Sequence, residues 1–160
     1  ETFTTYREDI EKELSVIVEL AKNNPKVDNK NIFAVGFSNG GFWACFLAGT
    51  AKINAGASHY GVWKANMGRE ITNPYPMNYF SQKSSPLLAL HGEEDSTQKM
   101  KFVEEAWDEV KSSGGKLTTH VYLSADHAWD SKSKRFNAWD PKVKEDAFQR
   151  TLSFFKKHAR

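Results

Sequence analysis

A serine stands in the spacing that nucleophilic hydrolases use. Residues 36–40 read Gly-Phe-Ser-Asn-Gly, which places Ser38 in the pattern G-x-S-x-G. In a nucleophile elbow the serine occupies strained backbone geometry at a tight turn from a strand to a helix. Small residues two positions to either side avoid clashes there, and Gly36 and Gly40 fill those positions. Because the pattern also arises by chance, a glycine-rich turn or a phosphate-cradling loop is the alternative interpretation.

An acid and a base follow this serine in the chain order of such hydrolases. Asp95 ends the stretch His-Gly-Glu-Glu-Asp, which directly follows the apolar segment 86–90. His127 comes shortly after the segment 117–123. Both side chains are therefore expected at the carboxyl ends of parallel strands, where open α/β sheets place their sites. We expect His127 to take the proton of Ser38 as it attacks an acyl carbon, and Asp95 to hold the imidazole in the productive tautomer.

Other titratable residues compete for these roles. Glu93 and Glu94 are expected to form a solvated turn. Asp126 is expected to point away from the imidazole of His127, because the two residues are covalent neighbours. His91 is expected to pack or to hydrogen-bond beside the acid turn. Asp95 is therefore the preferred orienting acid.

Strands and helices alternate along the rest of the chain. We predict strands at 31–37, 53–60, 86–90 and 117–123, and helices at 10–21, 40–49, 102–110 and 140–155. The first strand is continuously apolar, which is typical of a strand buried on both faces. Right-handed crossovers then give a sheet of mostly parallel strands with helices on both faces, so the fold class is α/β. The segment 62–85 lacks periodicity and is expected to be a long aromatic-rich loop.

The composition excludes several classes of protein. The 160 residues include 22 Lys+Arg, 20 Asp+Glu and one cysteine. Charges so balanced and dispersed argue against a nucleic-acid binder. A lone Cys45 excludes an internal disulfide and multi-cysteine zinc sites, and the five histidines show no ligand spacing, so we expect neither a metal nor a cofactor. The apolar run 40–49 is too short to span a membrane, and without a leader after Glu1 we expect the cytoplasm as the compartment.

Taken together, these motifs resemble the dienelactone hydrolase family of the α/β-hydrolase superfamily. The resemblance rests on the elbow at 36–41, His-Tyr-Gly at 59–61, the acid turn at 91–95, His127 with Trp129, and the closing segment 145–155. The namesake enzymes use a cysteine nucleophile, and Ser38 is similar to the family's serine-bearing esterase branch. The resemblance implies an α/β-hydrolase-type sheet and a serine hydrolase that cleaves a small carboxylic ester or lactone through an acyl-enzyme on Ser38.

Four further residues are assigned to the site. The backbone N–H of Asn39 follows the nucleophile at a helix N-terminus, where donors and the helix dipole stabilise an oxyanion. Tyr60, Trp63 and Trp129 are expected to line the pocket of a small-molecule ester or lactone substrate.

The chain is expected to form a single domain, 1–160, that is the C-terminal portion of the fold. It opens with a crossover-type helix, and an apolar first strand needs neighbours on both sides. We therefore expect that N-terminal strands are missing from this chain and that its own N-terminal segment is a partner. The resemblance implies that the second oxyanion donor comes from that segment, so the chain alone is expected to be a poor enzyme.

Two alternatives to ester hydrolysis remain open. One is a peptidase of the same superfamily, which usually carries an additional domain. The other is a non-catalytic binding or scaffold module, in which the aromatic segment 62–85 serves a protein partner or an apolar ligand. Neither a nucleic acid nor a membrane is expected as a partner.

Overall fold

Four parallel strands form the central sheet of the computed structural model, which describes residues 3–66, 69–70, 74–133, 135 and 138–160. The strand order is β1-β2-β5-β6. The strands of the sheet are β1 (Phe33–Phe37), β2 (Ala55–His59), β5 (Leu87–Gly92) and β6 (Leu117–Tyr122). The helices are α1 (Arg7–Lys22), α2 (Asn39–Gly49), α3 (Met100–Ser112) and α4 (Pro141–Lys157). Each corresponds to a predicted element.

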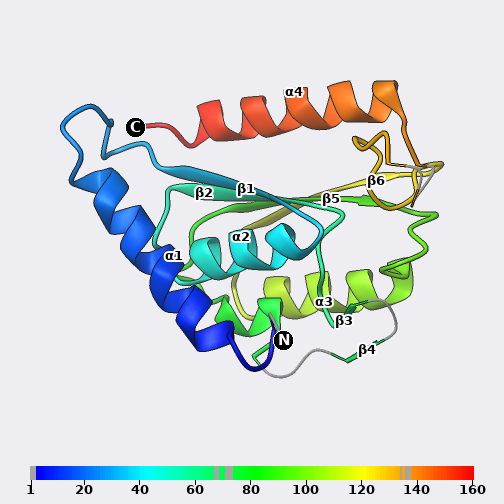
Figure 1. Ribbon diagram of the computed structural model, residues 1–160, viewed down its shortest axis with the longest axis horizontal. Coiled ribbons are helices and arrows are strands. Elements are labelled where there is room, and N and C mark those ends of the chain that lie inside the picture. Colours follow the sequence, from blue (N-terminus) through cyan, green and yellow to red (C-terminus); the bar gives the residue numbers. More distant parts are fainter. Residues whose placement is uncertain (1–2, 67–68, 71–73, 134, 136–137) are drawn as a thin grey trace.

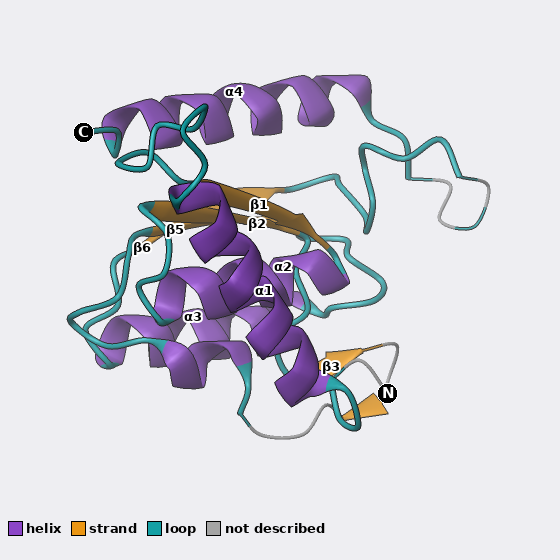
Figure 2. Ribbon diagram, turned by 60° about the vertical axis from the view of Figure 1, so that its left-hand side comes forward, coloured by secondary structure: helices purple, strands orange, loops and turns teal. Residues whose placement is uncertain are grey.

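Helices cover both faces of this sheet, which confirms the predicted α/β class. Helix α4 lies on one face, and α1, α2 and α3 lie on the other (Figures 1 and 2). Along β5, Leu87 and Ala89 belong to the core on the three-helix side, whereas Leu88 and Leu90 belong to the core under α4. A strand buried on both faces needs apolar residues at every position, which explains its unbroken apolar run.

The last helix begins where the sequence predicts. Asp140 is its N-cap, and its Oδ1 accepts hydrogen bonds from the backbone N–H groups of Lys142 at 2.9 Å and Val143 at 3.0 Å. Pro141 fills the first helical position, where no N–H donor is required. This cap fixes the point at which the chain leaves the loop that carries the candidate histidine.

Two segments differ from the prediction. Strand β5 extends two residues beyond Leu90, because its pairing with β6 continues to Gly92 opposite Tyr122. The expected loop 62–85 contains a short hairpin, β3 (Ala65–Asn66) and β4 (Arg69–Glu70), and a 3-10 helix, η1 (Pro76–Tyr79). Helix η1 begins with a proline and a capping hydrogen bond. It was not predicted because its residues show no hydrophobic periodicity. Residues 67–68 and 71–73 of this segment lie outside the described part.

Strand β1 is an outer strand of the sheet. Its Val35 and Phe37 side chains are 45% and 44% exposed, so the prediction that this strand is buried on both faces is wrong for the described chain. In the described part of the chain no strand pairs with its outer edge. An apolar strand of a parallel sheet is rarely left in this state, because an open edge pairs readily with another strand.

Two further properties of the fold concern its cysteine and its helices. Cys45 is fully buried in α2, and burial raises the pKa of its thiol to about 12, so the thiol stays protonated and unreactive. Within the described ranges, every helix lacks the combination of length and apolar character that a bilayer crossing requires.

Candidate active site

Ser38 occupies the sharp turn between β1 and α2. Its backbone has φ 51° and ψ −116°, a left-handed conformation that is strained for a residue with a side chain. Its N–H donates to the carbonyl of His59 at 3.1 Å, and its own carbonyl accepts from Val62 at 3.2 Å. The neighbouring strand β2 and the loop after it therefore hold the strained residue in place.

The glycines of the elbow have unequal roles. A Cβ added at Gly36 would lie 1.9 Å from the carbonyl oxygen of Gly40, so the predicted need for a small residue is confirmed at Gly36. At Gly40 the prediction is wrong, because an added Cβ meets no described atom within 4 Å. The second close approach is at Gly41 instead, where an added Cβ would lie 2.5 Å from the Oγ of Ser58 and 2.6 Å from the Cα of Gly61.

The three predicted side chains meet at the carboxyl end of the sheet. The Oγ of Ser38 lies 2.9 Å from Nε2 of His127, and Nδ1 of His127 lies 2.9 Å from Oδ2 of Asp95. A carboxylate only accepts hydrogen bonds, so Nδ1 carries the imidazole proton and Nε2 accepts from the serine hydroxyl. Asp95 and His127 are each 1% exposed, which protects their contact from water.

The acid turn fixes the orientation of Asp95. Its Oδ1 accepts hydrogen bonds from the backbone N–H groups of Thr97 at 2.8 Å and Gln98 at 2.7 Å. These bonds leave Oδ2 facing the imidazole. The two oxygens of the carboxylate therefore have different partners, and the turn determines which one meets His127.

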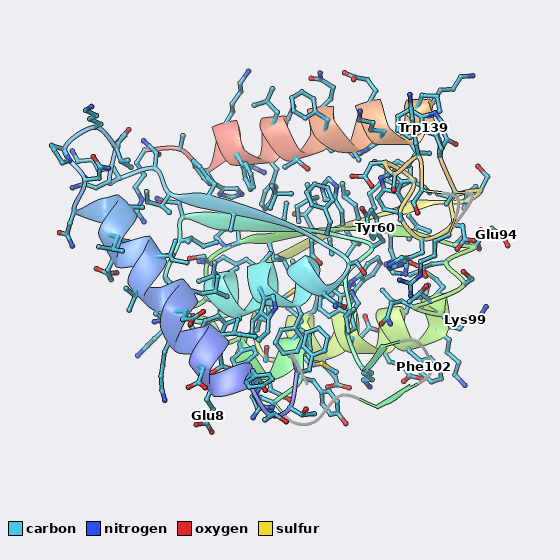
Figure 3. The ribbon with its side chains drawn as sticks, viewed as in Figure 1. Glu8, Tyr60, Glu94, Lys99, Phe102 and Trp139 are labelled. Carbon is cyan, nitrogen blue, oxygen red and sulfur yellow. The ribbon has the colours of Figure 1, made fainter. Side chains whose placement is uncertain are left out.

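The competing carboxylates lie elsewhere, as expected. Glu93 and Glu94 are exposed, and Figure 3 shows Glu94 at the outer end of the molecule. Asp126 accepts from the N–H and hydroxyl of Ser96 and from the backbone N–H of His127, not from its imidazole. Burial raises the pKa of Asp126, but these hydrogen bonds outweigh burial and lower it overall. Asp126 therefore ties the acid turn to the loop of the histidine.

A second histidine lies against the orienting acid. His91 is fully buried in β5, with Nε2 at 2.9 Å from the carbonyl of Gln98 and 3.3 Å from Oδ2 of Asp95. Both partners accept, so Nε2 carries a proton. Burial lowers the pKa of His91 more than the neighbouring carboxylate raises it, which favours the neutral ring. The expected hydrogen bonding of His91 at the acid turn is confirmed.

A contact from Tyr60 to the histidine loop was not predicted. The Tyr60 ring meets the imidazole of His127 edge-on at 4.9 Å, and its hydroxyl donates to Oδ1 of Asp130. Burial and this hydrogen bond raise the pKa of the Tyr60 hydroxyl, so it remains a donor. Tyr60 itself has φ 37°, a second strained position beside the site. Asp130 comes three residues after His127, and that spacing is the only sequence signal that pointed to it.

The residues assigned to the substrate pocket separate into two groups. Tyr60 and Trp129 pack edge-on at 4.7 Å beside His127. Trp63 is 1% exposed and packs against Trp107 of α3 in the core on the three-helix side. Trp129 is itself fully buried, so burial alone does not decide between the two tryptophans, and the pocket roles of Tyr60, Trp63 and Trp129 stay predictions. Asn39 begins α2 directly after the nucleophile, and its role as an oxyanion donor stays a prediction.

An apolar cavity of about 270 Å³ lies between β1, β2 and α4. Its wall includes Phe37, His59, Trp129 and Phe148, but none of the three candidate catalytic residues. The cavity therefore adjoins the site without forming an acyl pocket by itself.

Acid is expected to destabilise the fold through His59, which is 4% exposed. The hydroxyl of Thr151 donates to Ala147 and so accepts from Nε2 of His59 at 2.8 Å. Burial lowers the pKa of His59 to about 4 from 6.5, although Asp130 opposes the shift. Between these two values the unfolded chain binds more protons, so stability is complete above pH 6.5 and falls by ~3 kcal/mol towards pH 4.

Urea unfolding at several pH values measures this dependence. His59→Gln retains a hydrogen-bonding group but cannot titrate, so its stability should fall less between pH 6.5 and pH 4. Equal slopes for the two proteins would show that His59 does not cause the loss.

Within the described ranges, no group of three or more His, Cys, Asp or Glu side chains is placed so that it could hold a metal ion.

Comparisons with known proteins identify the family and the fold of this chain. Residues 1–159 match the sequence profile described as the dienelactone hydrolase family. A Klebsiella pneumoniae protein described as a dienelactone hydrolase has a similar structure, with TM-score 0.77 and 20% identity over 92% of this chain and 60% of that one. A Thermogutta terrifontis esterase has a TM-score of 0.75 and 15% sequence identity, over 92% of this chain and 64% of the esterase. The acylaminoacyl peptidase of Pyrococcus horikoshii has a TM-score of 0.72 and 17% sequence identity, over 92% of this chain and 27% of the peptidase.

These likenesses establish the fold, and the family profile establishes the family. No curated protein matches significantly. The chain spans about 60–65% of the length of the first solved structures that it resembles. With its parallel sheet, its serine elbow and the profile match over nearly its whole length, the chain belongs to the dienelactone hydrolase family and has the α/β-hydrolase fold.

Proposed function

We propose that this chain carries the catalytic residues of a serine hydrolase that cleaves a small carboxylic ester or lactone. The observation that supports the proposal is the unbroken hydrogen-bonded series from Ser38 through His127 to Asp95, with both contacts at 2.9 Å. A serine hydroxyl is a weak nucleophile until a base accepts its proton, and this arrangement supplies that base at hydrogen-bonding distance.

The proposed reaction has two halves. The Oγ of Ser38 bonds to the acyl carbon while its proton moves to Nε2 of His127, and the imidazolium is stabilised by Asp95. The tetrahedral intermediate then expels the alcohol, which takes the proton from Nε2, and Ser38 keeps the acyl group. Water attacks the acyl-enzyme in the same way, giving its proton to Nε2, and the carboxylic acid leaves as Oγ regains a proton. Asn39 is proposed to donate its N–H to the oxyanion in both halves.

The outer edge of β1 bears on this activity, because β1 ends at the nucleophile. In a parallel sheet, alternate residues bond to the same neighbour, and Ile32 and Ser38 both bond to β2 or the residues flanking it. The backbone groups of Phe33, Val35 and Phe37 therefore point outward. We propose that a further strand from the same polypeptide pairs with this edge and supplies the second oxyanion donor.

Two other functions compete with ester hydrolysis. A peptidase would use the same three residues, and the structural likeness to an acylaminoacyl peptidase, at 17% identity, does not distinguish it from an esterase. A binding or scaffold module would not need an activated serine. Substrate preference distinguishes a peptidase from the proposed esterase. The reactivity of Ser38 distinguishes a binding module from it.

Labelling with a fluorophosphonate tests the proposal. Intact mass is measured after treatment of this chain, of a longer form that carries preceding residues, and of Ser38→Ala in both. We expect one adduct on the longer form, none on its Ser38→Ala variant, and slower labelling of the short chain, because one lost oxyanion donor typically costs about 10²- to 10³-fold in rate. Hydrolysis of p-nitrophenyl butyrate and of an acylated peptide anilide is then compared.

Two outcomes would overturn the proposal. Absence of an adduct on the folded longer form would mean that Ser38 is not activated and would favour a binding role. A strong preference for the anilide over the ester would replace the esterase with a peptidase.

A further inference from the structure

The loops at the opposite end of the sheet bring lysines together. Each of the four parallel strands is preceded by a lysine within a few residues: Lys30 before β1, Lys52 before β2, Lys83 before β5 and Lys116 before β6. Parallel strands all begin at the same edge, so side chains far apart in the sequence meet there. This edge lies near the C-terminus of the chain, away from the candidate active site (Figure 1).

These four lysines line one hollow. Its volume is about 460 Å³, and Lys22 and Arg160 complete its cationic lining. No Asp or Glu stands among the described residues that line it. Lys22 pairs with Glu19 at 3.0 Å. No salt bridge joins a carboxylate of the described chain to the four strand-entry lysines. Asp28 is the carboxylate near Lys30, and hydrogen bonds from Asn31 and Lys30, together with the charge of Lys30, lower its pKa. The whole chain has a formal charge of only +2, so the hollow holds a local excess of positive charge.

Side-chain hydrogen bonds fix the loops around this hollow. Asn54 donates to the carbonyl of Lys30 at 2.6 Å and accepts from Ile32 at 2.8 Å, which joins the entries of β1 and β2. Ser84 is 1% exposed and donates to the carbonyl of Gly49 at 2.7 Å, which anchors the entry of β5 to the end of α2. The backbones that carry the lysines therefore keep a fixed spacing, although the lysine side chains reach into solvent.

Compensation of helix dipoles accounts for Lys22 but not for the four strand-entry lysines. Cations stabilise a helix when they lie in its last turn, and Lys22, Lys111, Lys156 and Lys157 occupy such positions. Lys30, Lys52, Lys83 and Lys116 lie outside every helix. Like charges gathered in one hollow repel each other, and an anion relieves that repulsion.

We propose that this hollow binds a soluble anion that carries two or more phosphate groups. Lysine ammonium groups act as point charges for phosphate oxygens, and several of them at fixed spacing suit several phosphates of one ligand. A hollow of about 460 Å³ is larger than a single phosphate needs and lies within the range of small-molecule sites. The site is separate from Ser38 and does not depend on the proposed hydrolysis.

Calorimetric titration with inorganic tripolyphosphate at low salt tests this site. The test variant is the triple substitution Lys52→Ala, Lys83→Ala and Lys116→Ala. The matched control is Lys12→Ala, Lys101→Ala and Lys142→Ala, which removes the same charge from exposed helix positions outside the hollow. Circular dichroism verifies that each variant is folded, and Lys83→Glu alone serves as a second test variant with a single change in an exposed loop.

We expect saturable binding of one tripolyphosphate by the wild type and by the control, weaker binding of orthophosphate, and binding about tenfold or more weaker in the test variant. Absence of saturable binding by the wild type would overturn the proposal. Equal weakening in the test variant and the control would also overturn the proposal, because binding would then depend only on the net charge of the protein. Equal affinity for citrate would overturn the assignment to phosphate.

Discussion

Replacing Asp95 with asparagine is expected to lower the rate of acylation of Ser38 by about 10⁴-fold. The reason lies in the acid turn, where Oδ1 accepts from the N–H groups of Thr97 and Gln98. An asparagine would place its carbonyl oxygen there, so its NH₂ group would face Nδ1 of His127. The imidazole would then carry its proton on Nε2, where it cannot accept the proton of Ser38.

The measurement is the second-order rate of fluorophosphonate labelling, followed by kcat for an ester. Asp126→Asn is the matched control, because the amide oxygen can still accept from Ser96 and from the backbone of His127. We expect the control to stay within severalfold of wild type. If Asp95→Asn kept more than about a tenth of the wild-type rate, another group would be the orienting acid.

Gly36→Ala is expected to destabilise the protein by about 3–5 kcal/mol and to abolish labelling of Ser38. The added methyl group would lie 1.9 Å from the carbonyl oxygen of Gly40, a backbone atom that moves only if the start of α2 moves. Because Ser38 lies between these two glycines, any shift that relieves the clash also displaces the nucleophile.

Gly40→Ala provides the control for this prediction. It adds the same methyl group where no described atom lies within 4 Å, and alanine is preferred to glycine in a helix by about 1 kcal/mol. Urea unfolding should therefore show unchanged or slightly greater stability for Gly40→Ala. Similar losses in both variants would mean that the elbow tolerates a shift of α2.

The two predictions concern different requirements of one site. Asp95 and His127 meet only because β5 and β6 are neighbours in the sheet. Ser38 reaches His127 only because the elbow presents it above the end of β1. A variant that disrupts the hydrogen-bonded series should lose activity without unfolding, whereas one that disrupts the elbow should lose both. Measuring stability and labelling together separates the two cases.

Much of this architecture could be predicted from the sequence, because it depends on neighbouring residues. The run from Asn31 to Phe37 predicts a strand, and Asp140 followed by proline marks a helix start. The spacing of Gly36 and Ser38 predicts an elbow, since the clash that excludes a side chain arises within five residues. The serine, the acid and the base are then expected to meet, because each follows a parallel strand and the carboxyl ends of these strands share one edge.

Other features were decided by contacts between distant segments. Nothing in the local pattern shows that Trp63 and Trp129 pack on opposite faces of the sheet, because each is a large apolar residue in an irregular segment. Only their contacts, Trp63 with Trp107 and Trp129 with Tyr60, place them. The bond from Tyr60 to Asp130 joins residues 70 positions apart.

The charges give the clearest example of what the tertiary structure decided. In the sequence, Lys30, Lys52, Lys83 and Lys116 are dispersed among nearly equal numbers of acidic residues, and no partner is indicated. The parallel sheet places all four strand entries at one edge and gathers these lysines around one hollow. The sequence by itself determined the elements and the chemistry of the elbow, because short-range sterics and periodicity encode them. Only the tertiary structure decided contacts such as that of Tyr60 with Asp130 and the gathering of the four lysines, because these depend on strand order and on packing across the sheet.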